Sequence, residues 1–190
     1  MTGITRRSFV DRAFKGSVLT LTFSVGGAQL LLTPQQARAQ QVPLKHLDAT
    51  QVRILELLGE TILPGSPALG LAHFIDHQLG VDPNEALLIA KYFQIPLPYR
   101  NFYAAGLQMS AATAQRVAGK PITEQSASEL TSSVRELSKP GPPVDGFPLF
   151  VFYMCLRSDA VDVMYGTPAG FEKLNIPYME HIMPPETWNG

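Results

Sequence analysis

Clusters of proline and glycine divide this chain into short segments and limit what it can fold into. They occur at residues 64–67, 80–83, 95–98, 119–121 and 140–146. A proline pushes the residue before it out of the helical region, and glycine is common where a helix ends. Between these breaks, apolar residues recur every three or four positions, the spacing of a helix with one buried face. The pattern therefore predicts an all-α fold of short helices.

We expect five to six helices from these segments. They cover residues 52–62, 69–79, 86–93, 101–117, 123–137 and 147–164. Asp48 or Thr50 can cap the first helix, and residues 82–85 have the pattern of a capping box at the start of the third. The segment 123–137 has a narrow apolar stripe, so its helix is expected at the surface.

The most apolar stretch, residues 147–156, has two possible structures. Its aromatic and β-branched residues, such as Phe150 and Val151, would suit a strand. A strand needs a partner of comparable quality, and none stands out elsewhere in the chain. We therefore predict a buried helix that runs to about Met164.

Residues 165–190 contain several prolines and glycines and little helical periodicity. We expect an extended C-terminal arm that carries Tyr165, Phe171, Tyr178 and Trp188. A small helical domain is not expected to cover all of these aromatic side chains, and interfaces use aromatic anchors. The arm is therefore a candidate contact with another chain; the alternative is that it wraps over its own core.

The first 39 residues have the pattern of a twin-arginine export signal. Its features are Arg6, Arg7 and the apolar Phe9, an uncharged stretch at 16–32, and the small residues Ala37 and Ala39. Cleavage after Ala39 would leave 40–190 as a single domain. Export by this pathway predicts a periplasmic protein that folds before it crosses the membrane, so the chain either binds a cofactor or travels with a partner that does.

The alternative for residues 16–32 is a retained membrane anchor. This stretch has seventeen residues, among them Gly16, Gly26 and Gly27. A stable membrane span needs about 20 mostly apolar residues, so the stretch is a poor anchor.

Charge argues against a nucleic-acid partner. Residues 40–190 carry ten basic and fifteen acidic side chains, and the basic ones are scattered singly from Lys45 to Lys173. A nucleic-acid surface needs clustered positive charge. The length of this part is sufficient for one domain with its own core.

Only one pair of residues has a spacing that suggests a metal-binding site. His73 and His77 are four residues apart on an expected helix, with Asp76 between them. This spacing can place two imidazoles on one metal, but a third ligand is not evident. The alternative is a pair of polar histidines at the surface or at an interface.

Other signs of chemistry are few. The sequence has no nucleophile elbow, phosphate loop, dinucleotide-binding glycine pattern or haem-attachment motif, so we expect no cofactor site in this chain. Cys155 is the only cysteine. It is either a small buried apolar side chain or forms a disulfide with a partner chain.

Two segments carry a resemblance to a known family. Residues 55–64 end in Ile62-Leu63-Pro64 and lead to the run Phe74-Ile75-Asp76, and residues 165–171 read Tyr-Gly-Thr-Pro-Ala-Gly-Phe. Together with the leader, this order resembles the gluconate 2-dehydrogenase subunit 3 family over most of residues 5–188.

The resemblance implies a small, cofactor-free accessory subunit of a periplasmic flavin-dependent sugar or alcohol dehydrogenase. Its large partner would hold FAD, perform the chemistry and be exported bound to this chain by the twin-arginine translocase. A cytochrome c subunit with haem c often takes the electrons, and the complex can associate with the membrane. The alternatives are a membrane-tethered assembly factor that keeps residues 16–32, or a stand-alone periplasmic metal protein that uses His73 and His77.

Overall fold

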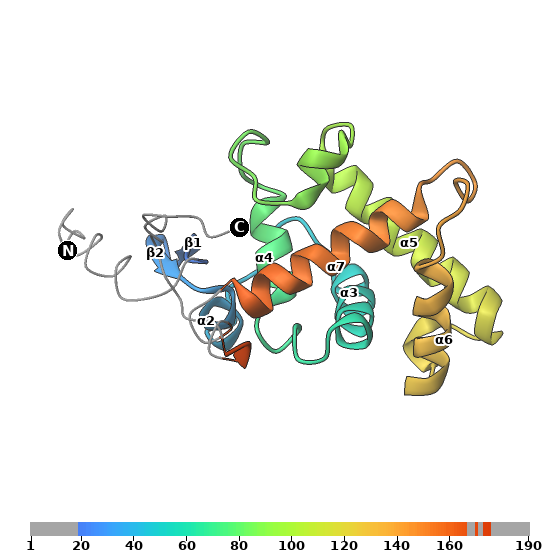
Figure 1. Ribbon diagram of the computed structural model, residues 1–190. Helices are drawn as coiled ribbons and strands as arrows, with labels where there is room; N and C mark the ends of the chain where they lie inside the picture. The colour runs from blue at the N-terminus through green and yellow to red at the C-terminus, as the bar shows by residue number, and fades with distance from the viewer. Residues whose placement is uncertain (1–18, 167–169, 171–172, 176–190) are drawn as a thin grey trace, which may run out of the picture.

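The computed structural model describes residues 19–166, 170 and 173–175 (Figure 1). In this part of the chain, six α-helices surround one core, and the only sheet is a two-stranded hairpin. The predicted all-α class is confirmed.

The hairpin and a short helix come first. Strands β1 (Leu21–Val25) and β2 (Ala28–Leu32) pair antiparallel, with Leu21 opposite Leu32. Gly26 and Gly27 form the two-residue turn, and both have positive φ, which glycine adopts without steric cost. Helix α2 (Pro34–Ala39) follows and begins with a reciprocal capping box between Thr33 and Gln36.

This hairpin differs from the continuous helix that a retained membrane anchor at residues 16–32 would form. A membrane helix would be continuous, whereas residues 21–32 form two strands. Within the described residues, no helix is long and apolar enough to cross a membrane. The leader prediction depends on Arg6, Arg7 and Phe9, which lie outside the described residues.

Helices α3 (Ala49–Ile62) and α4 (Leu71–Gln78) form where the sequence predicts them. Asp48, one of the two predicted caps, accepts a hydrogen bond from the Gln51 amide. Gly70 precedes α4 with a φ of 91°, and a Cβ atom there would lie 2.2 Å from the Pro34 carbonyl oxygen. Only glycine allows α2 and the start of α4 to approach this closely.

The predicted helix over 86–93 is wrong in type and extent. The structure has a 3₁₀ helix, η1 (Ile89–Phe93), preceded by a turn at 82–86. The Asp82 carboxylate accepts from the Asn84 amide instead of capping a longer helix. The Gln78 side chain accepts from the Leu87 amide, which holds this segment in a non-helical path.

The next helices pack as a pair. Helix α5 (Tyr99–Ala118) leads through a 3₁₀ turn, η2 (Ile122–Glu124), to α6 (Ala127–Leu137). A capping box between Ser126 and Glu129 begins α6, three residues after the predicted start at 123. Helix α6 buries a narrow stripe that includes Leu130 and Val134, in agreement with its expected surface position.

Helix α7 (Leu149–Tyr165) is the buried helix that the sequence predicts in place of a strand. It contacts α3, α4, α5 and α6 and is drawn in orange in Figure 1. A Cβ atom at Gly106 of α5 would lie 2.2 Å from the Phe152 ring, so the absence of a side chain sets the distance between these helices.

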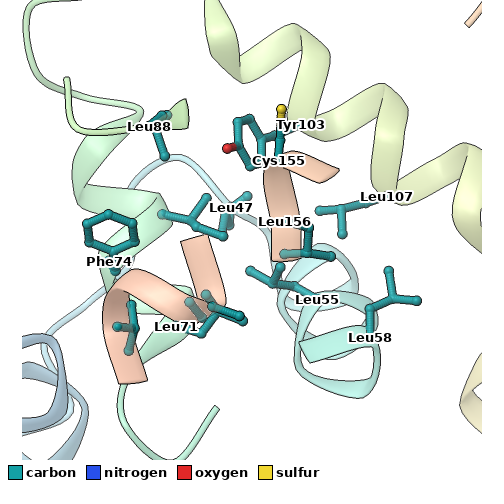
Figure 2. Packing of buried hydrophobic residues seen from close by; sticks show 14 of the residues in the cluster. Leu47, Leu55, Leu58, Leu71, Phe74, Leu88, Tyr103, Leu107, Cys155 and Leu156 are labelled. Atoms are coloured by element: carbon teal, nitrogen blue, oxygen red, sulfur yellow. The ribbon is translucent and has the colours of Figure 1, made fainter. Parts of the chain in front are cut away.

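The core lies where α3, α4, α5 and α7 meet (Figure 2). Its most buried leucines are at most 1% exposed and are Leu55, Leu58, Leu71, Leu88, Leu107 and Leu156. Each fully buried side chain of this kind stabilises the fold by roughly 1.5–3 kcal/mol. The core therefore holds the long helices in place, and the segment between α4 and α5 contributes the fully buried Leu88 and Ala90 to it.

Candidate functional site

Asp76 is a buried carboxylate whose oxygens accept hydrogen bonds from the backbone. The amides of Lys45, His46 and Leu47 donate to it at 2.7–3.1 Å. The side chain is only 5% exposed. Backbone amides satisfy the charge of a buried carboxylate, so Asp76 joins α4 to the segment before α3.

His73 and His77 also form hydrogen bonds with the backbone, each with a different segment. The Nε2 atom of His73 lies 3.1 Å from the Val42 carbonyl oxygen, and that of His77 lies 3.0 Å from the Thr22 carbonyl oxygen. Burial lowers the pKa of both imidazoles, so the neutral ring that donates from Nε2 is favoured. Each ring thus serves as a donor that ties α4 to an earlier part of the chain.

The described structure places no third metal ligand beside His73 and His77. Among residues 19–166, 170 and 173–175, no three His, Cys, Asp or Glu side chains cluster closely enough to hold a metal ion. Asp76, the nearest acid in sequence, points its carboxylate to backbone amides. The four-residue spacing of His73 and His77 places them on one helix, but their Nε2 atoms bond to separate segments.

A pocket of about 270 Å³ lies between the hairpin and α4. Strand β1 contributes Thr22 and Phe23, the Phe23 ring lying 5.0 Å from the His77 ring. His46, His73 and His77 also line this pocket. This volume is slightly below the roughly 300–1,000 Å³ of pockets that hold small-molecule ligands.

A second polar cluster lies inside the core, between α5 and α7. The Tyr103 hydroxyl donates to the Asp159 carboxylate, and neither side chain is exposed. Burial raises the pKa of Asp159 to about 7, although the Tyr103 hydrogen bond opposes this change. Asp159 also differs from Asp76 in its hydrogen bonds: Asp76 accepts from three backbone amides, whereas the Oδ1 atom of Asp159 has no hydrogen-bond partner.

Cys155 lies beside this cluster in the core (Figure 2) and has no exposed surface. Burial raises the pKa of its thiol to about 12, with a further contribution from Asp159. Nucleophilic and disulfide chemistry require an accessible thiolate. A disulfide from Cys155 to another chain does not fit this placement, whereas the small buried apolar side chain does.

The segment between α4 and α5 carries four of the seven large apolar side chains that are exposed among the described residues. Tyr92 is 74% exposed, Leu97 58%, Leu87 51% and Phe93 44%. We call these four residues the apolar loop surface; the segment is green in Figure 1. Contiguous exposed apolar patches mark binding surfaces, and the nearness of these four residues in sequence makes this segment a candidate for one.

Sequence reasoning did not identify this surface, because an amphipathic helix over 86–93 would have buried part of it. The available signal was the run from Tyr92 to Leu97, in which two aromatic residues precede the prolines at 96 and 98. Prolines at both positions prevent a helix there.

The residues predicted for the partner contact are placed only in part. Tyr165 ends α7 and is partly buried. Phe171, Tyr178 and Trp188 lie outside the described residues. Of the predicted leader residues, Ala37 and Ala39 both belong to α2.

Comparison with protein families matches residues 49–184 to gluconate 2-dehydrogenase subunit 3. The matched range covers more than two thirds of the chain. The chain belongs to the gluconate 2-dehydrogenase subunit 3 family. The resemblance found in the sequence is thereby confirmed. No curated protein and no solved structure matches the chain.

The family match begins at Ala49, the first residue of α3. It therefore includes α3 to α7 and the apolar loop surface, while the hairpin and α2 precede it. The family is described as a subunit, so the chain is expected to act in association with other subunits of a gluconate dehydrogenase complex.

Proposed function

We propose that this chain is the non-catalytic small subunit of a periplasmic flavin-dependent dehydrogenase of the gluconate type. Its role is to carry the FAD-containing large subunit through the twin-arginine pathway and to stabilise it. The observation that carries this proposal is the family match over residues 49–184. Hydride transfer belongs to the large subunit, and a cytochrome c subunit with haem c receives the electrons. In this proposal the chain associates with the membrane through the complex.

The polar groups of the chain support an accessory role. Asp76, His73 and His77 all bond to the backbone of neighbouring segments, so their hydrogen bonds stabilise the fold. A catalytic acid or base must instead reach a proton of the substrate. Tyr103 and Asp159 bond to each other in the core and have no exposed surface through which a substrate could reach them.

The apolar loop surface is the part of the described structure that best suits the large subunit. Tyr92 and Phe93 offer aromatic area of the kind that forms the centre of protein interfaces. The segment also follows directly from α4 and leads into α5, so rigid helices hold both of its ends. In this proposal the aromatic residues of the C-terminal arm, including Tyr178 and Trp188, form a further contact with the large subunit.

The test is co-purification from the periplasm with a tagged chain. The wild type is expected to recover a larger protein with flavin fluorescence. Tyr92→Ser combined with Phe93→Ser should reduce the recovered flavin at least about tenfold, because truncation of an interface anchor costs about 2 kcal/mol or more. Val117→Ser is the matched control, since Val117 is an exposed apolar residue on α5.

The outcomes separate two parts of the proposal. A wild-type chain recovered without any flavoprotein would refute the subunit role. Full recovery with the double variant would show that the large subunit binds elsewhere.

Export is tested with Arg6→Lys combined with Arg7→Lys. Both this chain and its flavoprotein partner should then remain in the cytoplasm. Normal export of the partner would refute the carrier role while leaving the subunit role intact.

A further inference from the structure

The sequence that reads as a signal-peptidase site lies within a packed helix. Such a site requires small side chains at Ala37 and Ala39, which the peptidase must bind. In the structure both belong to α2, and Ala37 has no exposed surface. A peptidase therefore cannot reach the Ala37 side chain while α2 is packed on α4.

The backbone around the Ala39–Gln40 bond is also held in place. The Gln40 amide donates to the Gln36 carbonyl at 2.9 Å, and the Val42 amide donates to the Ala37 carbonyl at 3.0 Å. An enzyme that binds an extended peptide must break such bonds first. Cleavage here requires local unfolding of α2.

Three interactions oppose that unfolding. The first turn of α2 has its capping box, and its last turn has an ion pair between Arg38 and Glu56. The close approach of Gly70 to Pro34 fixes α2 against the start of α4. Local opening is rare where a segment is capped, paired and packed.

The residues before α2 are part of the same core. Four of them are at most 8% exposed, namely Leu19, Leu21, Phe23 and Leu32. Removal of residues 1–39 would take these side chains away and expose the surfaces that they cover. It would also remove the Thr22 carbonyl that His77 contacts.

We infer that the Ala39–Gln40 bond is not cleaved in the folded chain and that residues 19–39 remain as a structural part of the exported subunit. This inference rests on the proposed function, because export in the folded state means that the peptidase meets α2 already packed. The hairpin and α2 then form a permanent layer over α4.

The first test is the N-terminus of the chain recovered from the periplasm, measured by intact mass and N-terminal sequencing. The wild type is expected to begin before residue 19. Ala39→Lys removes the small residue that a peptidase needs, and Ala39 is exposed, so the fold is retained. Wild type and variant should share one N-terminus. A wild-type chain that begins at Gln40 would overturn the inference.

The second test needs no export and uses the purified full chain. Trypsin can cut after Arg38, one residue from the Ala39–Gln40 bond, and so reports whether α2 opens. Gly70→Ala places a Cβ atom against Pro34 and should speed this cut at least about tenfold. Gly141→Ala is the control, because a Cβ atom there meets nothing within 4 Å.

The two tests also separate this inference from the proposed function. A chain that stays in the cytoplasm contradicts the proposed function, and the trypsin comparison still decides whether α2 protects the bond. Rapid cleavage after Arg38 in the wild type, equal to that in Gly70→Ala, would overturn the inference even if export is normal.

Discussion

Asp159 is expected to make this protein less stable as the pH rises from 4 to 7. The ordinary pKa of the carboxyl is 3.8, and burial raises it to about 7 in the folded chain. Between these values the folded state keeps a proton that the unfolded state has lost. The stabilisation is therefore complete below pH 3.8 and is lost as the pH rises through the folded pKa.

The size of this effect follows from the two pKa values. One pKa unit corresponds to about 1.4 kcal/mol, so the free energy of unfolding should fall by up to about 4 kcal/mol, most of it between pH 4 and 7. The side chain has no exposed surface, so solvent does not screen the effect. This loss is a large fraction of the stability of a typical domain.

Asp159→Asn removes the titration and keeps an acceptor for the Tyr103 hydroxyl. At pH 4 the variant should be less stable than the wild type by about 1–2 kcal/mol, because its amide group lacks a full set of partners. At pH 8 it should be more stable by about 2 kcal/mol. Urea unfolding followed by far-ultraviolet circular dichroism at each pH measures the difference.

The comparison isolates Asp159 because the two proteins share every other titrating group. Glu85→Gln, at an exposed position, is the matched control and should give a curve parallel to the wild type. Parallel curves for Asp159→Asn and the wild type from pH 4 to 8 would refute the reasoning. They would mean that the carboxyl ionises in the folded chain as it does in the unfolded one.

Three other substitutions test the packing and the polar contacts by urea unfolding. Gly106→Ala should lower the free energy of unfolding by about 1–3 kcal/mol, because its Cβ atom meets Phe152; an unchanged value would contradict the close packing. Asp76→Asn should cost about 3 kcal/mol through weakened bonds to three amides, and a cost below 1 kcal/mol would contradict the buried charge. The folded pKa of His77 is lowered from 6.5, so stability falls as the pH drops below 6.5; His77→Gln should reduce that fall, and an unchanged slope would contradict it.

The sequence predicts the helices of this fold well because proline and glycine mark their ends. The assignment of α7 is the clearest case: the stretch at 147–156 has strand-forming residues, and the lack of a partner strand correctly favours a helix. The hairpin is missed for the opposite reason. Its two strands lie in an uncharged run before Ala37 that also suits a signal, although Gly26 and Gly27 between two apolar runs are a hairpin pattern.

The polar contacts are less accessible to sequence reasoning. The spacing of His73 and His77 places both on α4, but their acceptors, the Val42 and Thr22 carbonyls, lie 31 and 55 residues away in sequence. Which backbone group meets a ring is decided by packing between distant segments. The same is true of Cys155, whose burial depends on all the helices that surround α7.

The distribution of polar and apolar groups in the described part of the chain supports the proposed accessory role. The carboxylate of Asp76 and the two histidines of α4 bond inward, to the backbone. Tyr92 and Leu97, by contrast, expose large apolar surface to solvent, which is unfavourable for an isolated chain. A second protein surface would remove that cost, and it would do so without any change in the polar contacts that hold α4. This arrangement suits the proposed accessory subunit: the hydrogen bonds of Asp76, His73 and His77 serve the fold, and the exposed apolar residues are available for association.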